Sequence, residues 1–290
     1  MPLHVLGAPS SAGAYSPGQE RAPASLREAG LLQALGNNVI DRGDVAGFRW
    51  RPDRGSPRAQ HVETVARVAR DVAQRVERSV RDGRVLVLGG DCTVGVGTVA
   101  GLRAARGTAP GLIYLDMHPD LNVPTSTVDG ALDWMGLAHM LAIDGTCPPL
   151  RDVGGTPPLL QPHDVVLLGY DERPATPHER ETVARLHIRS ETMAALQADP
   201  GAAARRALDA LADHEALAVH FDVDVVNFVD APLSENIERA RGATLDQALA
   251  ALAVLLGDPR VAALTVTELN PDHADDETLQ RFVAGLAAAL

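Results

Sequence analysis

The sequence predicts an α/β protein whose central, mostly parallel sheet is covered by helices on both faces. Its predicted strands are continuous apolar runs, such as LIYL at 112–115 and LAVHF at 217–221. Runs of this kind are typical of strands buried on both sides. Helical stretches alternate with them along the 290 residues, and this alternation favours parallel strands joined by crossover helices. We therefore expect one domain over residues 1–290.

Composition excludes several classes of protein. With 46% hydrophobic residues the chain can bury a substantial core. A formal net charge of −12 argues against nucleic acid as a partner, and the 3% aromatic content leaves few stacking platforms for single strands. We find no signal peptide and no apolar run of about eighteen residues that would span a membrane. The two cysteines form no C-x-x-C pair, so a reducing cytoplasm is the expected location.

Apolar periodicity and turn residues predict the elements of the first half. Valines recur at spacings of three and four over 62–76, which predicts a long amphipathic helix that packs on the sheet. Gly, Ser and Pro at 7–18, and Arg, Gly and Pro at 43–58, predict loops. The expected order is strand 3–6, helix 24–34, strand 39–40, helix 61–80, strand 85–88, helix 95–105, a strand from 112 and helix 134–142.

The second half continues the same alternation. Pro and Gly around 147–162 predict a loop, and the stretch at 169–178 predicts a second one. The expected elements are strand 165–168, helix 179–186, strand 187–188, helix 201–211, strand 217–221, helix 244–255, strand 261–266 and helix 277–290. An acidic turn over 268–276 separates the last two.

Three potential metal ligands follow the strand that begins at residue 112. Asp116, His118 and Asp120 occupy alternate positions where an apolar run gives way to a loop. In extended backbone alternate residues point to one side, so two carboxylates and an imidazole would converge. An Asp-rich turn or helix N-terminus is the alternative interpretation of this motif.

Two further strand ends carry related residues. Asp222 and Asp224 repeat the two-residue spacing, and the run RVLVLGG leads into Asp91 and Cys92. Ligands collect at the carboxyl ends of parallel strands, so we expect these ends to face one pocket. Their carboxylates supply about the number of oxygens that a pair of divalent cations requires.

Four motifs in order carry a family resemblance that covers most of the chain. LGGDC at 88–92, DMHPDLN at 116–122, FDVD at 221–224 and TELNP at 267–271 resemble the signatures of the arginase and agmatinase family, the ureohydrolases. The resemblance implies a three-layer α/β/α fold. It also implies hydrolysis of a guanidino group by a water that bridges two manganese ions.

The resemblance assigns roles to individual residues. Asp116 and Asp222 would bridge both metals, Asp120 and Cys92 would complete one, and His118 and Asp224 would complete the other. Glu268 would hold the guanidinium group, because a carboxylate matches its planar fork. We expect Glu268 and Asp120 to take part in catalysis. The residues expected to bind substrate are Asn122, Thr127, Asp129, Asp133 and Glu172.

Departures from the family pattern shape the functional prediction. Cys92 stands where the family has a histidine ligand, and thiolate is the softer ligand; an inert buried thiol is the alternative. Asp133 stands where arginases carry a histidine thought to shuttle protons, and Asp129 where a serine is usual. Glu172 is a candidate contact for the α-amino group. We interpret His220 as a core histidine that faces away from Asp222, with a role as a base as the alternative.

The lost histidine favours a substrate that needs less help from a proton donor. Nω-hydroxy-L-arginine is less basic than arginine, and both departures resemble family members that hydrolyse it to hydroxyurea and L-ornithine in D-cycloserine biosynthesis. We therefore predict a manganese-dependent hydrolase of Nω-hydroxy-L-arginine in antibiotic biosynthesis. Ordinary arginase, a deacetylase-like metal hydrolase and a non-catalytic ligand-binding member are the alternatives. The C-terminus at Leu290, inside the last predicted helix, favours a monomer.

Overall fold

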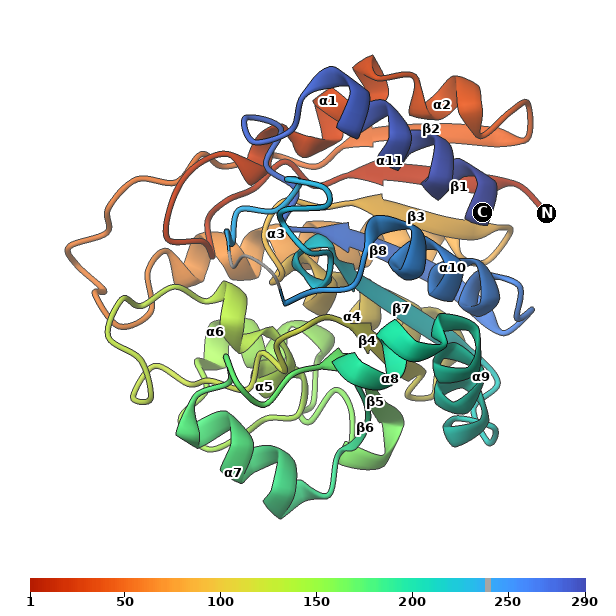
Figure 1. Ribbon diagram of the computed structural model, residues 1–290. Helices are drawn as coiled ribbons and strands as arrows, with labels where there is room; N and C mark the ends of the chain where they lie inside the picture. Colours follow the sequence, from red (N-terminus) through yellow and green to blue (C-terminus); the bar gives the residue numbers. More distant parts are fainter. Residues whose placement is uncertain (238–240) are drawn as a thin grey trace.

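The computed structural model describes residues 1–237 and 241–290 and confirms the predicted fold class. An eight-stranded sheet has the order β2-β1-β3-β8-β7-β4-β5-β6, and neighbouring strands pair in parallel (Figure 1). The strands are β1 (Leu3–Gly7), β2 (Val39–Asp44), β3 (Arg84–Leu88), β4 (Gly111–Leu115), β5 (Val165–Tyr170), β6 (Arg189–Thr192), β7 (Leu217–Asp222) and β8 (Val261–Thr267).

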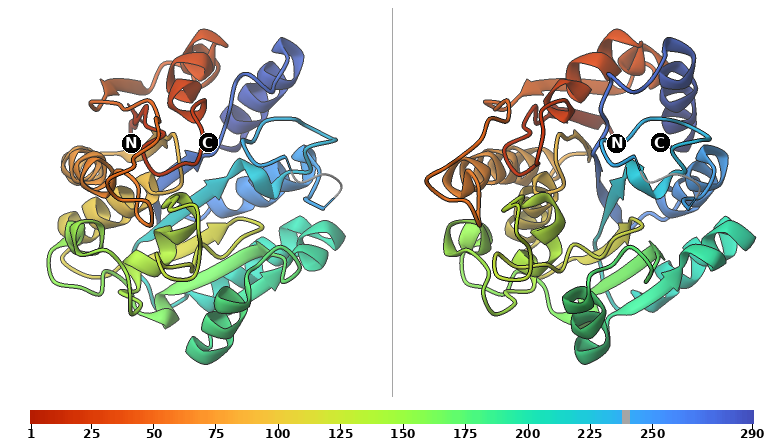
Figure 2. Two further views of the ribbon diagram at one scale, coloured as in Figure 1. Left: turned by 90° about the vertical axis from the view of Figure 1, so that its left-hand side faces the viewer. Right: turned by 60° about the vertical axis from the view of Figure 1, so that its left-hand side comes forward.

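Helices on both faces of the sheet complete the three layers (Figures 1 and 2). One face is covered by α1 (Ala22–Glu28), α2 (Leu31–Ala34), α8 (Met193–Ala198), α9 (Pro200–Ala210), α10 (Leu245–Leu256) and α11 (Asp276–Ala289). The other core takes in α3 (Val62–Ser79), α4 (Val94–Arg106), α5 (Gly136–Met140), α6 (Pro148–Arg151) and the apolar side of α7 (Pro177–Leu186).

Burial on both faces explains the apolar strand runs. Along β3, Leu86 and Leu88 enter one core, whereas Val85 and Val87 enter the other. Alternate residues of a strand point to opposite faces, so a strand between two helix layers needs apolar residues throughout.

Helices α3 and α4 approach each other closely because glycines lie between them. A Cβ at Gly97 would sit 2.4 Å from the carbonyl oxygen of Ala69, and one at Gly101 would sit 2.4 Å from that of Ala73. These small residues bring α4 against α3, where Val65, Val68, Val72 and Val76 are buried as the valine spacing predicts.

Some boundaries differ from the predictions for local reasons. The helix expected over 24–34 is divided into α1 and α2 at Gly30, whose φ is +89°. The strand expected at 187–188 lies at Arg189–Thr192, because His187 takes a left-handed conformation with φ +53° and ends α7. Helices α6 and α8 were not predicted; Thr192 caps α8 by accepting a hydrogen bond from the N–H of Ala195.

The strand order brings distant motifs together. Strands β3, β8, β7 and β4 are successive neighbours at the centre of the sheet, so the four motifs that follow them share one edge. Among the described helices, none has both the length and the apolar character needed to cross a membrane.

Candidate metal centre

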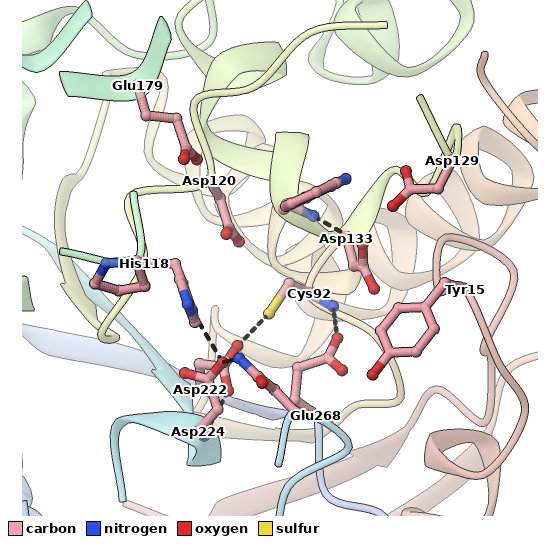
Figure 3. Close-up of a pocket in the computed structure, with 13 residues that line it drawn as sticks. Tyr15, Cys92, His118, Asp120, Asp129, Asp133, Glu179, Asp222, Asp224 and Glu268 are labelled. Atoms are coloured by element: carbon pink, nitrogen blue, oxygen red, sulfur yellow. Dashed lines mark hydrogen bonds and ion pairs between the residues drawn. The ribbon is translucent and has the colours of Figure 1, made fainter. Parts of the chain in front are cut away.

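A cavity of about 290 Å³ opens at the carboxyl ends of the central strands (Figure 3). Acidic side chains dominate its wall: Asp120, Asp129, Asp133, Glu179, Asp222, Asp224 and Glu268. The other described residues that line it are Tyr15, Cys92, His118, Trp134, Pro174 and Asn236. Such a concentration of carboxylates favours cationic ligands.

Two groups of potential ligand atoms lie within this edge of the sheet. Asp116, His118 and Asp224 form one group, and Cys92, Asp116, His220 and Asp222 form the other. Within each group the ligand atoms lie within 4.8 Å of one another. Asp116 belongs to both groups, which is where a bridging carboxylate would have to lie.

Direct contacts hold these groups in place. His118 Nδ1 lies 3.0 Å from Asp224 Oδ2, and the backbone N–H of His118 donates to Asp116 Oδ1 across 2.6 Å. Burial lowers the pKa of His118, but the two aspartates outweigh it and raise that pKa well above its usual range. The thiol of Cys92 donates to Asp222 Oδ2 across 2.9 Å.

The buried oxygens fit bound divalent cations. Asp116 Oδ2 and Asp224 Oδ1 are buried and have no hydrogen-bond partner within the described part of the chain. Burial, reinforced by Asp224, raises the pKa of Asp116 to about 7, and burial also raises that of Asp222 well above its usual range. A cation would satisfy the unpaired oxygens and offset the repulsion between the carboxylates.

Asp120 lines the cavity but belongs to neither group. Its φ is +47°, and its Oδ2 accepts a hydrogen bond from the Tyr114 hydroxyl across 2.5 Å. Its place as a metal ligand therefore stays a prediction.

Glu268 lines the cavity, and hydrogen bonds hold both of its carboxylate oxygens. Its Oε1 accepts the backbone N–H of Cys92 across 2.8 Å, and its Oε2 accepts the Gln19 amide across 3.0 Å. Burial, followed by repulsion from Asp133, raises the pKa of Glu268 well above its usual range. A cationic group bound beside it would favour the charged carboxylate.

The predicted substrate contacts divide into two sets. Asp129 and Asp133 line the cavity, whereas Asn122, Thr127 and Glu172 are not among the residues that line it. Asn122 Oδ1 accepts the hydroxyls of Ser126 and Thr176, each across 2.9 Å. Burial, with repulsion from Asp91, raises the pKa of Asp133 well above its usual range.

Neither Asn122 nor Thr127 has all its polar atoms satisfied. The Nδ2 of Asn122 and the Oγ1 of Thr127 are buried without a partner among the described residues, while the Thr127 carbonyl accepts from Arg58. Glu172 is exposed, and its backbone carbonyl accepts a hydrogen bond from the Arg180 side chain across 3.3 Å.

Five residues in the cavity wall were not predicted: Tyr15, Trp134, Pro174, Glu179 and Asn236. Glu179 forms a capping box with Thr176, and the sequence T-P-H-E at 176–179 carries that signal. Asn236 donates to Asp224 Oδ2 across 3.2 Å, and Tyr15 reaches the cavity from the N-terminal loop. Tyr15 and Asn236 lie in loops, where the sequence has no periodic pattern that would predict a site.

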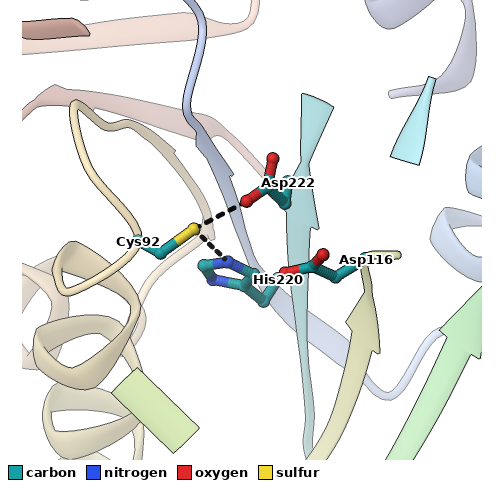
Figure 4. A group of neighbouring side chains, drawn as sticks. All are labelled: Cys92, Asp116, His220 and Asp222. Carbon is teal, nitrogen blue, oxygen red and sulfur yellow. Dashed lines mark hydrogen bonds between the residues drawn. The ribbon is translucent and has the colours of Figure 1, made fainter. Parts of the chain in front are cut away.

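His220 corrects one prediction. It is buried as expected, but it does not face away from Asp222, because residues two apart in a strand point to the same side. Its Nε2 lies 3.4 Å from Cys92 Sγ (Figure 4). Burial lowers the pKa of His220 to about 3, so the ring is neutral.

Fold and site together define an α/β protein with a buried, carboxylate-rich metal centre at the carboxyl edge of a parallel sheet. The model of the Arginase family matches residues 1–290, and the chain belongs to that family.

Comparisons with individual proteins agree with this assignment. An arginase of Bacillus caldovelox is 32% identical over 174 residues, 58% of this chain and 57% of that protein. An arginase of Agrobacterium fabrum is 29% identical over 303 residues, 99% of this chain and 89% of that protein. Several of the matched arginases, that of Bacillus caldovelox included, are covered over less than two thirds of their own length. The solved structure of the Bacillus caldovelox arginase has a TM-score of 0.87 at 24% identity, covering 99% of this chain and 97% of that one.

Proposed function

We propose that this protein is a manganese-dependent hydrolase whose substrate is Nω-hydroxy-L-arginine and whose products are hydroxyurea and L-ornithine. Membership of the arginase family supports the reaction class, and the acidic cavity supports a guanidino-type substrate. The choice of the hydroxylated substrate rests on the residues of this chain.

The metal centre would hold two manganese ions. Asp116 and Asp222 would bridge them, Cys92 and Asp120 would complete one site, and His118 and Asp224 would complete the other. Carboxylates outnumber the single thiolate, which favours a hard cation such as Mn²⁺. When bound, the cations lower the pKa of water and so supply hydroxide at neutral pH.

The observation that carries the substrate choice is the lack of a free imidazole. Among the described residues that line the cavity, His118 is the only histidine, and its Nδ1 already faces Asp116 and Asp224. Expelling ornithine from arginine requires a positioned proton donor. A hydroxyguanidine is less basic, so its neutral and more easily attacked form is accessible with less help. Glu268 would hold the group, and Asn122 and Thr127 would orient the amino-acid end, although neither is among the residues that line the cavity.

Two alternatives have specific support. Ordinary arginase is favoured by the names of the matched relatives. A non-catalytic, ligand-binding member is favoured by the absence of an imidazole free to donate a proton, among the described residues that line the cavity.

Parallel assays with the manganese-loaded protein decide between them. We expect hydroxyurea release from Nω-hydroxy-L-arginine to exceed urea release from L-arginine. Equal or faster turnover of L-arginine would instead identify an ordinary arginase, and no release from any guanidino compound would identify a binding protein. Glu268→Gln serves as the matched control, because it keeps the shape and removes the charge. We also propose a monomer, which gel filtration checks.

A further inference from the structure

The buried imidazole of His220 contacts the thiol of Cys92. His220 is 2% exposed, and its Nε2 lies 3.4 Å from Cys92 Sγ and 3.2 Å from Thr267 Oγ1. The Thr267 hydroxyl lies 3.3 Å from the same sulfur, so the three groups form a closed triangle.

The sheet fixes the ring of His220. In the register of the strands His220 pairs with Tyr114 on β4, and the two rings stack with centroids 4.2 Å apart and planes 2° apart. Tyr114 is itself held by its hydrogen bond to Asp120. The ring therefore cannot turn its Nε2 away from Cys92 without displacing buried neighbours.

The surroundings of the second nitrogen decide which one carries the proton. Nδ1 faces α4, where a Cβ built on Gly95 would sit 2.6 Å away, and it meets no partner among residues 1–237 and 241–290. An orphaned N–H in such a place is rarer in proteins than an under-satisfied acceptor. The neutral ring has one N–H, so this asymmetry puts the hydrogen on Nε2.

A protonated Nε2 is a donor and not a metal ligand. Metal-binding histidines donate their other ring N–H to an acceptor, and Nδ1 has none here within the described residues. His220 thus differs from Asp116 and Asp222, although all three lie near Cys92.

We propose that His220 is a positioning residue that donates its Nε2–H to Cys92 Sγ and holds the sulfur toward the metal. This inference rests on the proposed function, because it takes Cys92 as a ligand. Hydrogen bonds to a ligating sulfur reduce its electron donation, which helps a thiolate share a site with hard carboxylates.

Cobalt(II) in place of manganese tests the proposal, because a thiolate–cobalt bond gives a near-ultraviolet charge-transfer band. Cys92→Ser should abolish the band, and its absence in the unaltered protein would reject Cys92 as a ligand, which is part of the proposed function. His220→Phe keeps the stacked ring and removes the donor. It should move the band to lower energy, because the sulfur then donates more strongly. It should also weaken binding at this site about 10–100-fold, because the sulfur is no longer held toward the metal.

His220→Gln is the matched variant, because its amide nitrogen can replace Nε2 as a donor but is a poor ligand. We expect it to restore the band to near its original position. An unmoved band in His220→Phe would overturn the positioning role and leave the metal centre intact.

A measurement on the unaltered chain covers variants that fail to fold. Cadmium-113-loaded, ¹⁵N-histidine-labelled protein should show His220 protonated at Nε2 and uncoupled from cadmium. A ¹¹³Cd–¹⁵N coupling to His220 would establish it as a ligand and reject the proposal.

Discussion

The backbone N–H of Cys92 donates to Glu268 Oε1 across 2.8 Å, so one residue links a group of potential metal ligands to the proposed substrate carboxylate. Glu268 has a φ of +62°, in a region that non-glycine residues seldom occupy. Its backbone N–H is held by the carbonyl of Gly90 across 2.8 Å. Strain at a site is retained where the surroundings fix it, and here they fix the direction of a carboxylate.

Gln19→Leu should therefore impair substrate binding without unfolding the protein. Gln19 is fully buried and donates to Glu268 Oε2 across 3.0 Å. A hydrogen bond to a charged group contributes about 1.5–3 kcal/mol, so kcat/KM should fall about 10–100-fold. Steady-state kinetics with the preferred substrate measures the effect. Gln74→Leu, at an exposed position of α3, is the control, and an unchanged kcat/KM in Gln19→Leu would contradict the role given to Glu268.

Metal content should distinguish Asp116 from Asp224. Asp116 is shared by both ligand groups, whereas Asp224 belongs to one. Asp116→Ala should thus lose both manganese ions and Asp224→Ala only one, as measured by elemental analysis after dialysis. Exposed Asp209 provides the control, because its replacement by alanine should leave the content unchanged. Equal losses in Asp116→Ala and Asp224→Ala would reject the shared role of Asp116.

Much of the fold and the metal centre could be predicted because both depend on strict alternation. Buried strands such as β4 and β7 must be apolar on both faces, and the carboxylates that follow them keep the two-residue period. The same rule correctly applied places His220 beside Asp222. It cannot reveal that β8 lies between β3 and β7, because the order of strands depends on tertiary packing.

Loop residues of the site were beyond prediction for a related reason. Tyr15 and Asn236 reach the cavity through irregular backbone, whose path is set by contacts far apart in the chain. Ser16, for example, donates to Glu235, which is 219 positions away. Glu179 is different, because its capping box is a local signal.

Loss of that capping box should destabilise the protein measurably. Glu179 Oε2 accepts the N–H of Thr176 across 2.8 Å, and Oε1 accepts that of Leu121, beside Asp120, across 3.2 Å. Glu179→Ala leaves both donors unpaired and should lower the free energy of unfolding by about 2 kcal/mol. Urea denaturation checks this, with Glu181→Ala on the exposed side of α7 as control. A loss no larger than that control's would contradict the structural role.

His139 should make the protein less stable in mild acid. It is fully buried, its Nδ1 lies 2.7 Å from the carbonyl oxygen of Met135, and its Nε2 accepts the N–H of Cys147 across 3.0 Å. Protonation would set two N–H groups against each other, and burial lowers the pKa of His139 from 6.5 to about 4. Between pH 6.5 and about 4, His139 is protonated in the unfolded chain but stays neutral in the folded protein. The free energy of unfolding therefore falls as the pH drops through this range. The loss should be about 3 kcal/mol. Urea unfolding of the unaltered protein and of His139→Gln across this range gives the comparison, and a constant difference between them would refute the prediction.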